Sequence, residues 1–409
     1  MAIIAVAGTL DTKGPDHAFV ADVISQLGHQ PLLIDWGTLT AATVTPDVSR
    51  EQVAAAAGLN LPAVISRQDR GECVAAMASA APALLAQLYA AGKIHGVISL
   101  GGSSGTAIAA AAMRALPIGF PKLIVSTMAS GNIAPYVGTR DITVIPSVVD
   151  VAGLNQISRV IYSRAAGAIC GMVSVQAAAG SDRPVVVASM FGNTTACIIE
   201  ARRLLENAGC EVLVFHANGA GGRTMEALID SGLASGVLDI TTTELADELA
   251  GGVLTAGPDR LNAAARRGVP AVIGPGCLDM VNFGEPASVP ERYQGRRFYQ
   301  HNPQVTLMRT TPDECLQLGK ILADRINASS GPVTVLLPLR GISVISESGG
   351  AFHDPWADAT LFNAISQNLR DGIDLKTLDC TINDPQYAAA CVDALLKSMA
   401  LTSPLSETT

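Results

Sequence analysis

The stretch "AIIAVAGTLDTKGPDHAFVADVISQLGHQPLLIDWG", residues 2–37, decides the fold class of this chain. It opens with an apolar run of strand length and closes with another, "PLLIDWG". Between the two runs apolar side chains recur at helical spacing, and one face of the predicted helix carries Phe19, Val20, Val23, Ile24 and Leu27. Gly28 then stands where a glycine commonly ends a helix. A strand, a helix and a strand in this order predict a β–α–β unit with parallel strands.

The same order of runs returns 181 residues further along the chain. Residues 183–219 contain an apolar run, a helical run and a second apolar run. Under this shift Gly28 aligns with Gly209, and Asp35 aligns with His216, without a gap. Two further segments pair in the same way: residues 95–106 match 235–246, and residues 119–131 match 267–280.

This repetition predicts an α/β protein made of two tandem doubly wound, Rossmann-like parallel-sheet domains, with a ligand cleft between them. We expect an N-terminal domain over 1–180 and a C-terminal domain over 181–409. The boundary is placed in the small and polar stretch 177–184. Because such sheets bind ligands beyond the carboxyl ends of their strands, the loops that follow each strand are the candidate sites.

Composition and charge exclude several classes of protein. Hydrophobic residues make up 49% of the 409 residues and charged residues 15%, which argues against disorder. Aromatic residues, at 4%, are too few for platforms that stack single-stranded nucleic acid. A net charge of −9 opposes binding to nucleic acid or to an anionic membrane, and we expect neither partner. No apolar run reaches the roughly 18 residues of a transmembrane helix, and "AIIAVAG" predicts a buried strand rather than a signal peptide.

The eight cysteines are scattered and form no CxxC motif. This pattern predicts reduced, mostly buried thiols in a cytoplasmic protein, and no zinc site.

Three loops of the first domain offer many hydrogen-bond donors. "GTLDTKG" (8–14) supplies hydroxyls, a carboxylate and the Lys13 ammonium, and "STMASGN" (126–132) adds hydroxyls and an amide. "GGSSGT" (101–106) leaves backbone N–H groups uncovered at the start of a helix, where the helix dipole favours an anion such as phosphate. Together the three loops predict a phosphate cradle with Lys13 as its mobile charge.

Neither "GGSSGT" nor "GTLDTKG" is by itself a specific signal of phosphate binding. The chain contains no GxxxxGK[ST] motif, and "GGSSGT" is not GxGxxG. A tight strand-to-helix turn without a ligand is the alternative for "GGSSGT". For "GTLDTKG" the alternative is that Asp11 or Thr12 caps the next helix.

The second domain offers groups for acid–base chemistry. His216 ends a predicted strand, and "GAGGRT" and Glu226 follow it. Asp279 follows the strand "PAVIG", and "RRFYQHNPQVTLMRTT" places His301 in a further predicted loop. We take His216, Glu226, Asp279 and His301 as candidate catalytic residues. The candidate substrate-binding residues are Asn218, Gly221, Gly222, Asn282, Asn302 and Arg309, the last as a clamp for a carboxylate or phosphate. Structural roles remain open for each of them.

For two further segments the sequence predicts a structural role or an end effect rather than ligand binding. In "HDPWADATLF" (353–362), Asp354 is expected to cap a helix that begins with Pro355. The tail "TSPLSETT" is expected to be frayed.

Several of these motifs together resemble a known family. "GTLDTKG", "GGSSGT", "ALPIGFPKLIVSTMASGN", "YVGTRDITVIPSVVDVAGLN" and "PGCLDMVNFG" are similar to segments of the tomato mosaic virus resistance protein-like ATP-binding domain family, which has bacterial and fungal members. The resemblance covers nearly the whole chain. It implies two Rossmann-like subdomains, ATP binding with magnesium, and a homodimer.

The resemblance also implies the residues of the nucleotide loops. They are Gly8, Thr9, Asp11, Thr12, Lys13, Gly101, Gly102, Ser103, Gly105, Thr106, Ser126 and Gly131. Ser104 departs from the family, whose relatives often have a more glycine-rich turn there. The plant member continues into a barrel domain, so an activity that needs the barrel would require a separate barrel-domain protein.

Three functions remain open at this point. The first is a cytoplasmic ATP- or nucleotide-binding enzyme that acts on a small carbonyl or carboxylate compound in the inter-domain cleft. Here Asp11 or Asp279 could reach Mg²⁺. The second is a nucleotide-gated binding or regulatory module without turnover. The third is a hydrolase or carbon–carbon lyase of an oxo-acid that does not use ATP. The many polar, titratable groups that we expect in the cleft favour the first and the third function.

Overall fold

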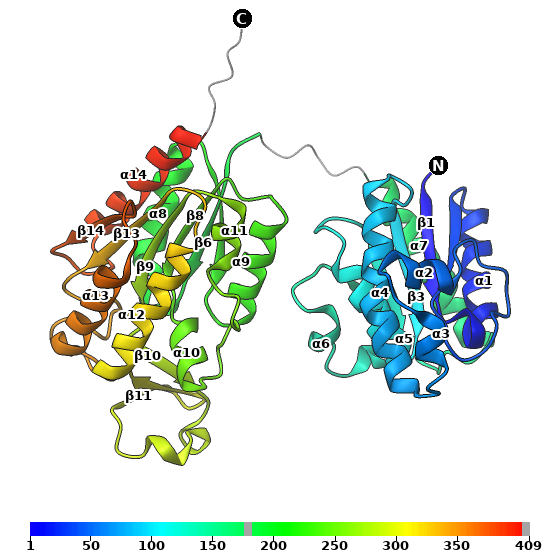
Figure 1. The fold of residues 1–409 in the computed structure, drawn as a ribbon, viewed down its shortest axis with the longest axis horizontal. Helices are drawn as coiled ribbons and strands as arrows, with labels where there is room; N and C mark the ends of the chain where they lie inside the picture. The colour runs from blue at the N-terminus through cyan, green and yellow to red at the C-terminus, as the bar shows by residue number, and fades with distance from the viewer. Residues whose placement is uncertain (176–181, 403–409) are drawn as a thin grey trace, which may run out of the picture. The chain divides into compact units, whose positions relative to one another are not determined.

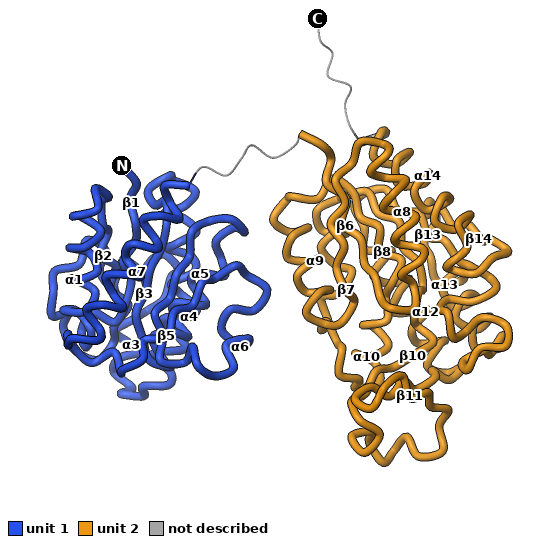
Figure 2. Tube along the Cα trace, turned by 180° about the vertical axis from the view of Figure 1, so that it is seen from behind, with its two compact units in different colours: residues 1–180 blue, residues 181–409 orange. Residues whose placement is uncertain are grey.

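The computed structural model describes residues 1–175 and 182–402, and the chain divides into two compact units, Met1–Gly180 and Ser181–Thr409 (Figures 1 and 2). Much of the boundary stretch 177–184, and the tail after Thr402, lie outside the described residues. Each unit is an α/β domain built on a parallel sheet, which confirms the predicted fold class. The structure defines each unit by itself, and the cleft between the units stays a prediction.

Unit 1 contains a five-stranded parallel sheet in the order β2-β1-β3-β4-β5. Its strands are β1 (Ile3–Gly8), β2 (Gln30–Asp35), β3 (Gly96–Gly101), β4 (Lys122–Ser126) and β5 (Thr143–Pro146). Its helices are α1 (Leu10–Gln26), α2 (Arg50–Ala56), α3 (Leu61–Ile65), α4 (Arg70–Ala90), α5 (Ser103–Arg114), η1 (Thr127–Ser130), α6 (Ala134–Val137) and α7 (Gln156–Ser174).

Helices cover both faces of this sheet because alternate strand residues point to opposite sides. On β1, Ala5 and Ala7 pack into one core with residues of α2, α3, α4 and α5. Ile4 and Val6 pack into a second core with residues of α1 and α7. This two-sided burial explains why "AIIAVAG" is apolar at every position rather than alternating.

Unit 2 repeats the strand order of unit 1 and adds one strand. Its six-stranded parallel sheet has the order β14-β13-β9-β8-β6-β7, which is the 2-1-3-4-5 order of unit 1 with a sixth strand after the fifth. The strands are β6 (Val185–Met190), β7 (Glu211–His216), β8 (Gly236–Thr241), β9 (Ala271–Gly276), β13 (Val333–Pro338) and β14 (Asp374–Leu378). Gly28 and Gly209, which the sequence repeat aligns, have φ of 84° and 86° after their helices. Both are left-handed turns that favour glycine.

The helices of unit 2 are η2 (Gly192–Thr194), α8 (Thr195–Asn207), α9 (Ala220–Asp230), α10 (Glu244–Ala250), α11 (Asn262–Arg267), α12 (Pro312–Asn327), α13 (Pro355–Asn368) and α14 (Pro385–Thr402). Residues of α8 and α14 pack into one core with Ala188 and Leu238 of the sheet. Residues of α9, α11 and α12 lie together with Val237 and Ile273, which point to the other face. Asp354 caps α13 by accepting the amide of Ala357 at 3.1 Å, as predicted.

A small antiparallel sheet branches off after β9, in the order β10-β12-β11. It consists of β10 (Met280–Phe283), β11 (Phe298–Asn302) and β12 (Val305–Arg309), and the turns η3 (Pro286–Ser288) and η4 (Glu291–Tyr293) precede β11. The prediction of a loop around His301 is therefore wrong, since His301 lies in β11. The helical and parallel-strand patterns used for the prediction did not detect this hairpin because every residue of β11 is exposed.

Among the described residues one helix, α4, could cross a membrane if only its length and composition are considered. In unit 1 its side chains Cys73, Met77, Leu84 and Leu85 are buried in the core beside the sheet. All eight cysteines are buried, as predicted, and none of them forms a disulfide in the structure.

Candidate functional site

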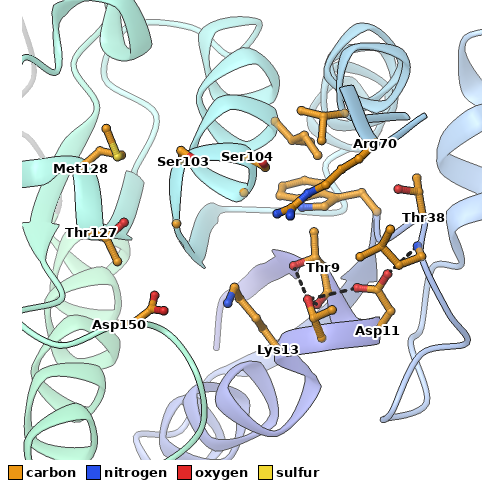
Figure 3. A pocket seen from close by; sticks show the side chains of 17 residues that line it. Thr9, Asp11, Lys13, Thr38, Arg70, Ser103, Ser104, Thr127, Met128 and Asp150 are labelled. Carbon is orange, nitrogen blue, oxygen red and sulfur yellow. Dashed lines mark hydrogen bonds between the residues drawn. The ribbon is translucent and has the colours of Figure 1, made fainter. Parts of the chain in front are cut away.

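A cavity of about 500 Å³ opens at the carboxyl end of the sheet in unit 1. The chain passes from β1 through α1 to β2 on one side of β1, and from β2 it crosses to β3 on the other side, so that α1 and α5 cover opposite faces of the sheet. The loops after β1 and β3 therefore diverge and leave a crevice, which is the usual ligand position in doubly wound sheets. Residues after both strands line the cavity (Figure 3), among them Thr9, Lys13, Gly102 and Ser104.

The N-terminus of α5 forms one wall of this cavity. Gly102 occupies the N-cap position, and no described side chain caps the helix. Ser103, Ser104 and Gly105 line the cavity, and backbone N–H groups in the first turn of a helix have no partner within the helix. This wall therefore presents free donors and the positive end of a helix dipole.

Two contacts behind this wall hold the turn in place. A Cβ on Gly101 would lie 3.0 Å from backbone atoms of Gly105, so a larger residue would force the strand and the helix apart by a few tenths of an ångström. The hydroxyls of Thr106 and Ser126 are hydrogen-bonded at 2.7 Å and join the turn to the end of β4. Ser126 also accepts the amide of Met128 at 2.9 Å.

The loop after β1 forms the opposite wall. Helix α1 begins at Leu10 with Thr9 at the N-cap, and its side chain makes no capping hydrogen bond. The prediction that Asp11 or Thr12 caps this helix is wrong, because the Asp11 carboxylate instead accepts the amide of Leu39 at 2.8 Å. Lys13 departs from helical geometry, with φ −130° and ψ 22°, and its ammonium donates to the carbonyl of Val151.

Buried polar groups position this loop. The Asp35 carboxylate accepts the amides of Leu10 at 3.1 Å and Gly37 at 2.8 Å, and it pairs with Arg50 at 2.7 Å. Burial raises the pKa of Asp35. These contacts tie the start of α1 to the end of β2.

His17 joins the loop to β3. Its Nδ1 lies 2.8 Å from the carbonyl of Lys13, and its Nε2 lies 3.4 Å from the amide of Leu100. Burial lowers the pKa of His17 to about 4, so the ring is neutral at pH 7. A neutral ring can donate to the carbonyl from Nδ1 and accept the amide at Nε2.

The cavity contains charges of both signs. The Lys13 ammonium and the Arg70 guanidinium are directed into the same space, with Ser103 and Ser104 at its edge (Figure 3). The carboxylates of Asp11 and Asp150 also line the cavity. Within the described residues no group of three His, Cys, Asp or Glu side chains could hold a metal ion. Mg²⁺ usually takes only one or two carboxylates together with phosphate oxygens. Asp11 or Asp150 could supply such a carboxylate.

Seven of the twelve predicted nucleotide residues line the cavity: Thr9, Asp11, Thr12, Lys13, Gly102, Ser103 and Gly105. The others lie behind it and shape the loops: Gly8, Gly101, Thr106, Ser126 and Gly131. Sequence reasoning missed further lining residues, which are Trp36, Thr38, Leu39, Arg70, Val74, Ile108 and Asp150. Trp36 and Asp150 follow β2 and β5, so the strand-end rule could have found them. Arg70 begins α4, and no sequence signal indicated it.

In unit 2 the protein's own carboxylate fills a glycine turn that follows the second strand of the sheet, β7. The turn "GAGGRT" leads into α9, and the amides of Gly219 and Gly222 donate to Oε1 of Glu244 at 2.6 and 3.2 Å. In the sequence repeat, Glu244 aligns with Ser104 of unit 1. The anion position at this helix N-terminus is therefore occupied from within the chain.

A buried ion cluster surrounds Glu244. Arg260 is 1% exposed and pairs with Glu244 at 2.6 Å, with Glu226 at 3.2 Å, and with Asp239. Glu226 also accepts the amides of Leu261 and Ala263 at 2.7 and 2.8 Å. Burial raises the pKa of Glu226. Both oxygens of this candidate catalytic carboxylate thus hold the fold together.

Asp279 and Arg309 belong to a second buried cluster. Asp279 accepts the hydroxyl of Ser343 at 2.7 Å, and burial raises its pKa. Arg309, which is 3% exposed, pairs with Asp358 at 2.5 Å and donates to the carbonyl of Phe352 at 2.9 Å. Burial raises the pKa of Asp358 to about 6. Asp358 in turn lines a cavity of about 210 Å³, together with Ser346 and His353.

The remaining predicted residues of unit 2 are dispersed. His216 ends the edge strand β7, with its ring centroid 5.2 Å from that of Phe191, and His301 is exposed on β11. Other predicted groups make local contacts. Asn218 accepts the amide of Gly221 at 3.0 Å, Asn282 donates to Asp247 at 2.7 Å, and Asn302 accepts the amide of Gln304 at 2.9 Å.

Comparisons with known proteins agree along the whole chain. The N-terminal domain model of the uncharacterised protein family UPF0261 matches residues 2–178, and the C-terminal domain model matches residues 183–399. A UPF0261 protein of Clostridium tetani is 44% identical over 398 residues, covering 97% of this chain and 98% of its own. One of Rhizobium meliloti is 48% identical over 394 residues, covering 96% and 98%.

A plant protein and some solved structures also match. The ToMV resistance protein Tm-1(GCR237) of Solanum lycopersicum is 40% identical over 336 residues, which are 80% of this chain and 45% of that protein. Among solved structures, a thioesterase domain from the curacin biosynthetic pathway matches 53% of this chain and 92% of its own, with 13% identity and a TM-score of 0.27. A TM-score this low carries no argument about function.

The predicted family resemblance is therefore confirmed, while the ATP binding that it implies stays a prediction. The chain belongs to the uncharacterised protein family UPF0261, through both of that family's domains.

Proposed function

We propose that unit 1 binds the phosphate groups of a nucleotide, ATP in the first place, at the carboxyl end of its sheet. One observation carries this proposal: the uncapped N-terminus of α5 opens into a cavity of about 500 Å³ that Lys13 and Arg70 also line. Backbone N–H groups, a helix dipole and two cations converge there on one space. This is the chemistry that holds phosphate at the start of a helix.

Two glycine turns, which follow different strands of their sheets in the two units, differ in whether a described side chain fills them. The glycine turn before α9 in unit 2 already binds the carboxylate of Glu244, with Gly219 donating at 2.6 Å. At the turn before α5, no described side chain caps the helix, and the small residues Gly102, Ser103 and Ser104 line the cavity there. Asp11 or Asp150 would hold Mg²⁺ together with phosphate oxygens, and a bound Mg²⁺ would offset phosphate charge.

The wider proposal is a cytoplasmic metabolic enzyme that forms a homodimer and acts on a small carbonyl or carboxylate compound. A nucleotide-gated module without turnover is its alternative. Release of phosphate from ATP, measured with and without candidate substrates, separates the two.

The direct test is thermal unfolding with ATP, with and without Mg²⁺. A ligand at about 100 times its Kd stabilises the folded state by roughly 2.7 kcal/mol, which raises the melting temperature of a unit of this size by about 5–10 °C. We expect this rise in the wild type and its loss in Lys13→Ala and Arg70→Ala. Arg67→Ala is the matched control, because Arg67 pairs with Glu72 at 3.0 Å and does not line the cavity. No rise at millimolar ATP would overturn the proposal.

A second candidate function rests on the 210 Å³ cavity of unit 2. His353 and Asp358 line it, and Arg309 pairs with Asp358 at its wall. Burial raises the pKa of Asp358 to about 6, and a carboxylate of raised pKa can act as the general acid or base that a hydrolase or carbon–carbon lyase of an oxo-acid requires. Stabilisation of unit 2 by a small oxo-acid, abolished in His353→Gln, is the expected result. Equal stabilisation of the variant would refute it.

A further inference from the structure

The indole N–H of Trp36 is a buried donor that lacks an acceptor. The side chain is 1% exposed, and Nε1 has no hydrogen-bond partner among the described residues. Its position is set by the backbone, because the Trp36 amide donates to the carbonyl of Gly8 at 3.0 Å at the joined ends of β1 and β2. The side chain lines the cavity of unit 1.

An unsatisfied buried donor is unusual and unfavourable. Buried indole N–H groups normally find a partner, and leaving a buried donor unpaired destabilises the folded state. A phenylalanine would supply aromatic packing at this position without that cost. A molecule that brought an acceptor to Nε1 from the cavity would satisfy this N–H.

The surroundings of Trp36 differ from the phosphate-binding wall. Leu39, Val74 and Ile108 line the cavity as well, and they contribute only apolar side-chain surface. The donors of the α5 N-terminus and the cations suit one end of a ligand. The indole and its apolar neighbours suit another end, which is flat or apolar but carries at least one acceptor atom.

We propose that Trp36 recognises the non-phosphate part of the nucleotide, with Nε1–H donating to a ring nitrogen or carbonyl oxygen of the base. The inference rests on the proposed function and narrows it: unit 1 selects nucleotides over inorganic polyphosphates of the same charge. Trp36 acts as the specificity residue, and Lys13 and the α5 N-terminus supply charge recognition without distinguishing what the phosphates are attached to.

The test compares ATP with tripolyphosphate, which has the phosphates and no base, by titration calorimetry with Mg²⁺. In the wild type we expect ATP to bind more tightly. Trp36→Phe should weaken ATP binding by about five- to tenfold, the effect of one hydrogen bond, and should leave tripolyphosphate binding unchanged. The matched control is Trp356→Phe, the same chemical change at a tryptophan of unit 2 that is 73% exposed, and it should alter neither affinity.

Fluorescence supplies a second readout that does not depend on how the variant folds. The chain has two tryptophans, so Trp356→Phe leaves Trp36 as the only one. ATP should change its emission, and tripolyphosphate should not. If ATP and tripolyphosphate bind but Trp36→Phe weakens both equally or neither, the inference is overturned while the proposed function stands. If the wild type binds neither, the proposed function fails and the inference fails with it.

Discussion

Protonation of His17 should destabilise unit 1 in mild acid. The ring lies between the carbonyl of Lys13 and the amide of Leu100, and its pKa is lowered from 6.5 to about 4 by burial. Between these two values the unfolded chain binds a proton that the folded chain does not. Unfolding is therefore favoured as the pH falls, and the stability that neutral His17 supports is fully present only above about pH 6.5.

The size of the effect follows from the two pKa values. Between pH 7 and pH 5, linkage to this one group lowers the free energy of unfolding by about 2 kcal/mol. His17→Gln retains a donor and an acceptor but cannot be protonated. The variant should therefore lose about 2 kcal/mol less than the wild type over the same interval. Other titrating groups contribute to both proteins and cancel in the difference.

Urea unfolding at pH 7 and pH 5 measures this difference. In a Trp356→Phe background the emission of Trp36 reports on unit 1, because Trp36 is its only tryptophan. Val20→Ala is the packing control: Val20 is fully buried on the same helix, so its truncation should lower stability by the same amount at both pH values. Equal pH dependence in the wild type and His17→Gln would refute the reasoning.

Three further outcomes are expected from the two glycine turns and a strained loop. Glu244→Gln leaves Arg260 with less compensating charge in a buried cluster and should lower the stability of unit 2 by about 3 kcal/mol, measured by urea unfolding with Trp356 as the probe. Gly101→Ala places a Cβ 3.0 Å from the backbone of Gly105, so it should displace the α5 N-terminus and weaken ATP binding at least tenfold in calorimetry. Val148 is 76% exposed at a φ of 62°, which is strained for a β-branched residue, and Val148→Gly should raise the melting temperature of unit 1 by a few degrees, equivalent to about 1 kcal/mol. No change in Val148→Gly would show that the loop relaxes in solution.

Much of the fold was predictable because it depends on local patterns. The apolar run before Gly8 and the helical spacing after it are properties of neighbouring residues, and both appear as β1 and α1. The aligned glycines Gly28 and Gly209 take the same left-handed turn. Periodicity and the internal repeat were therefore enough to detect two α/β units, while the spatial order of their strands came from the structure.

The site was only partly predictable, because contacts between distant residues decide it. "GGSSGT" and "GAGGRT" look alike as glycine turns, yet the second is closed by Glu244, which lies 25 positions from Gly219. Nothing within either motif shows whether a side chain elsewhere fills it. Likewise Arg70 lines the cavity from the start of a helix that follows no strand directly.

The carboxylate of Glu244 has a consequence for how the two halves respond to the cell. It is an anion tethered to its own binding site, so its local concentration is fixed by the chain and cannot be diluted or competed away. The turn before α9 is thus occupied from the moment unit 2 folds. If the cavity of unit 1 binds a nucleotide as proposed, its occupancy follows the concentration of that nucleotide, and so does the stability of unit 1.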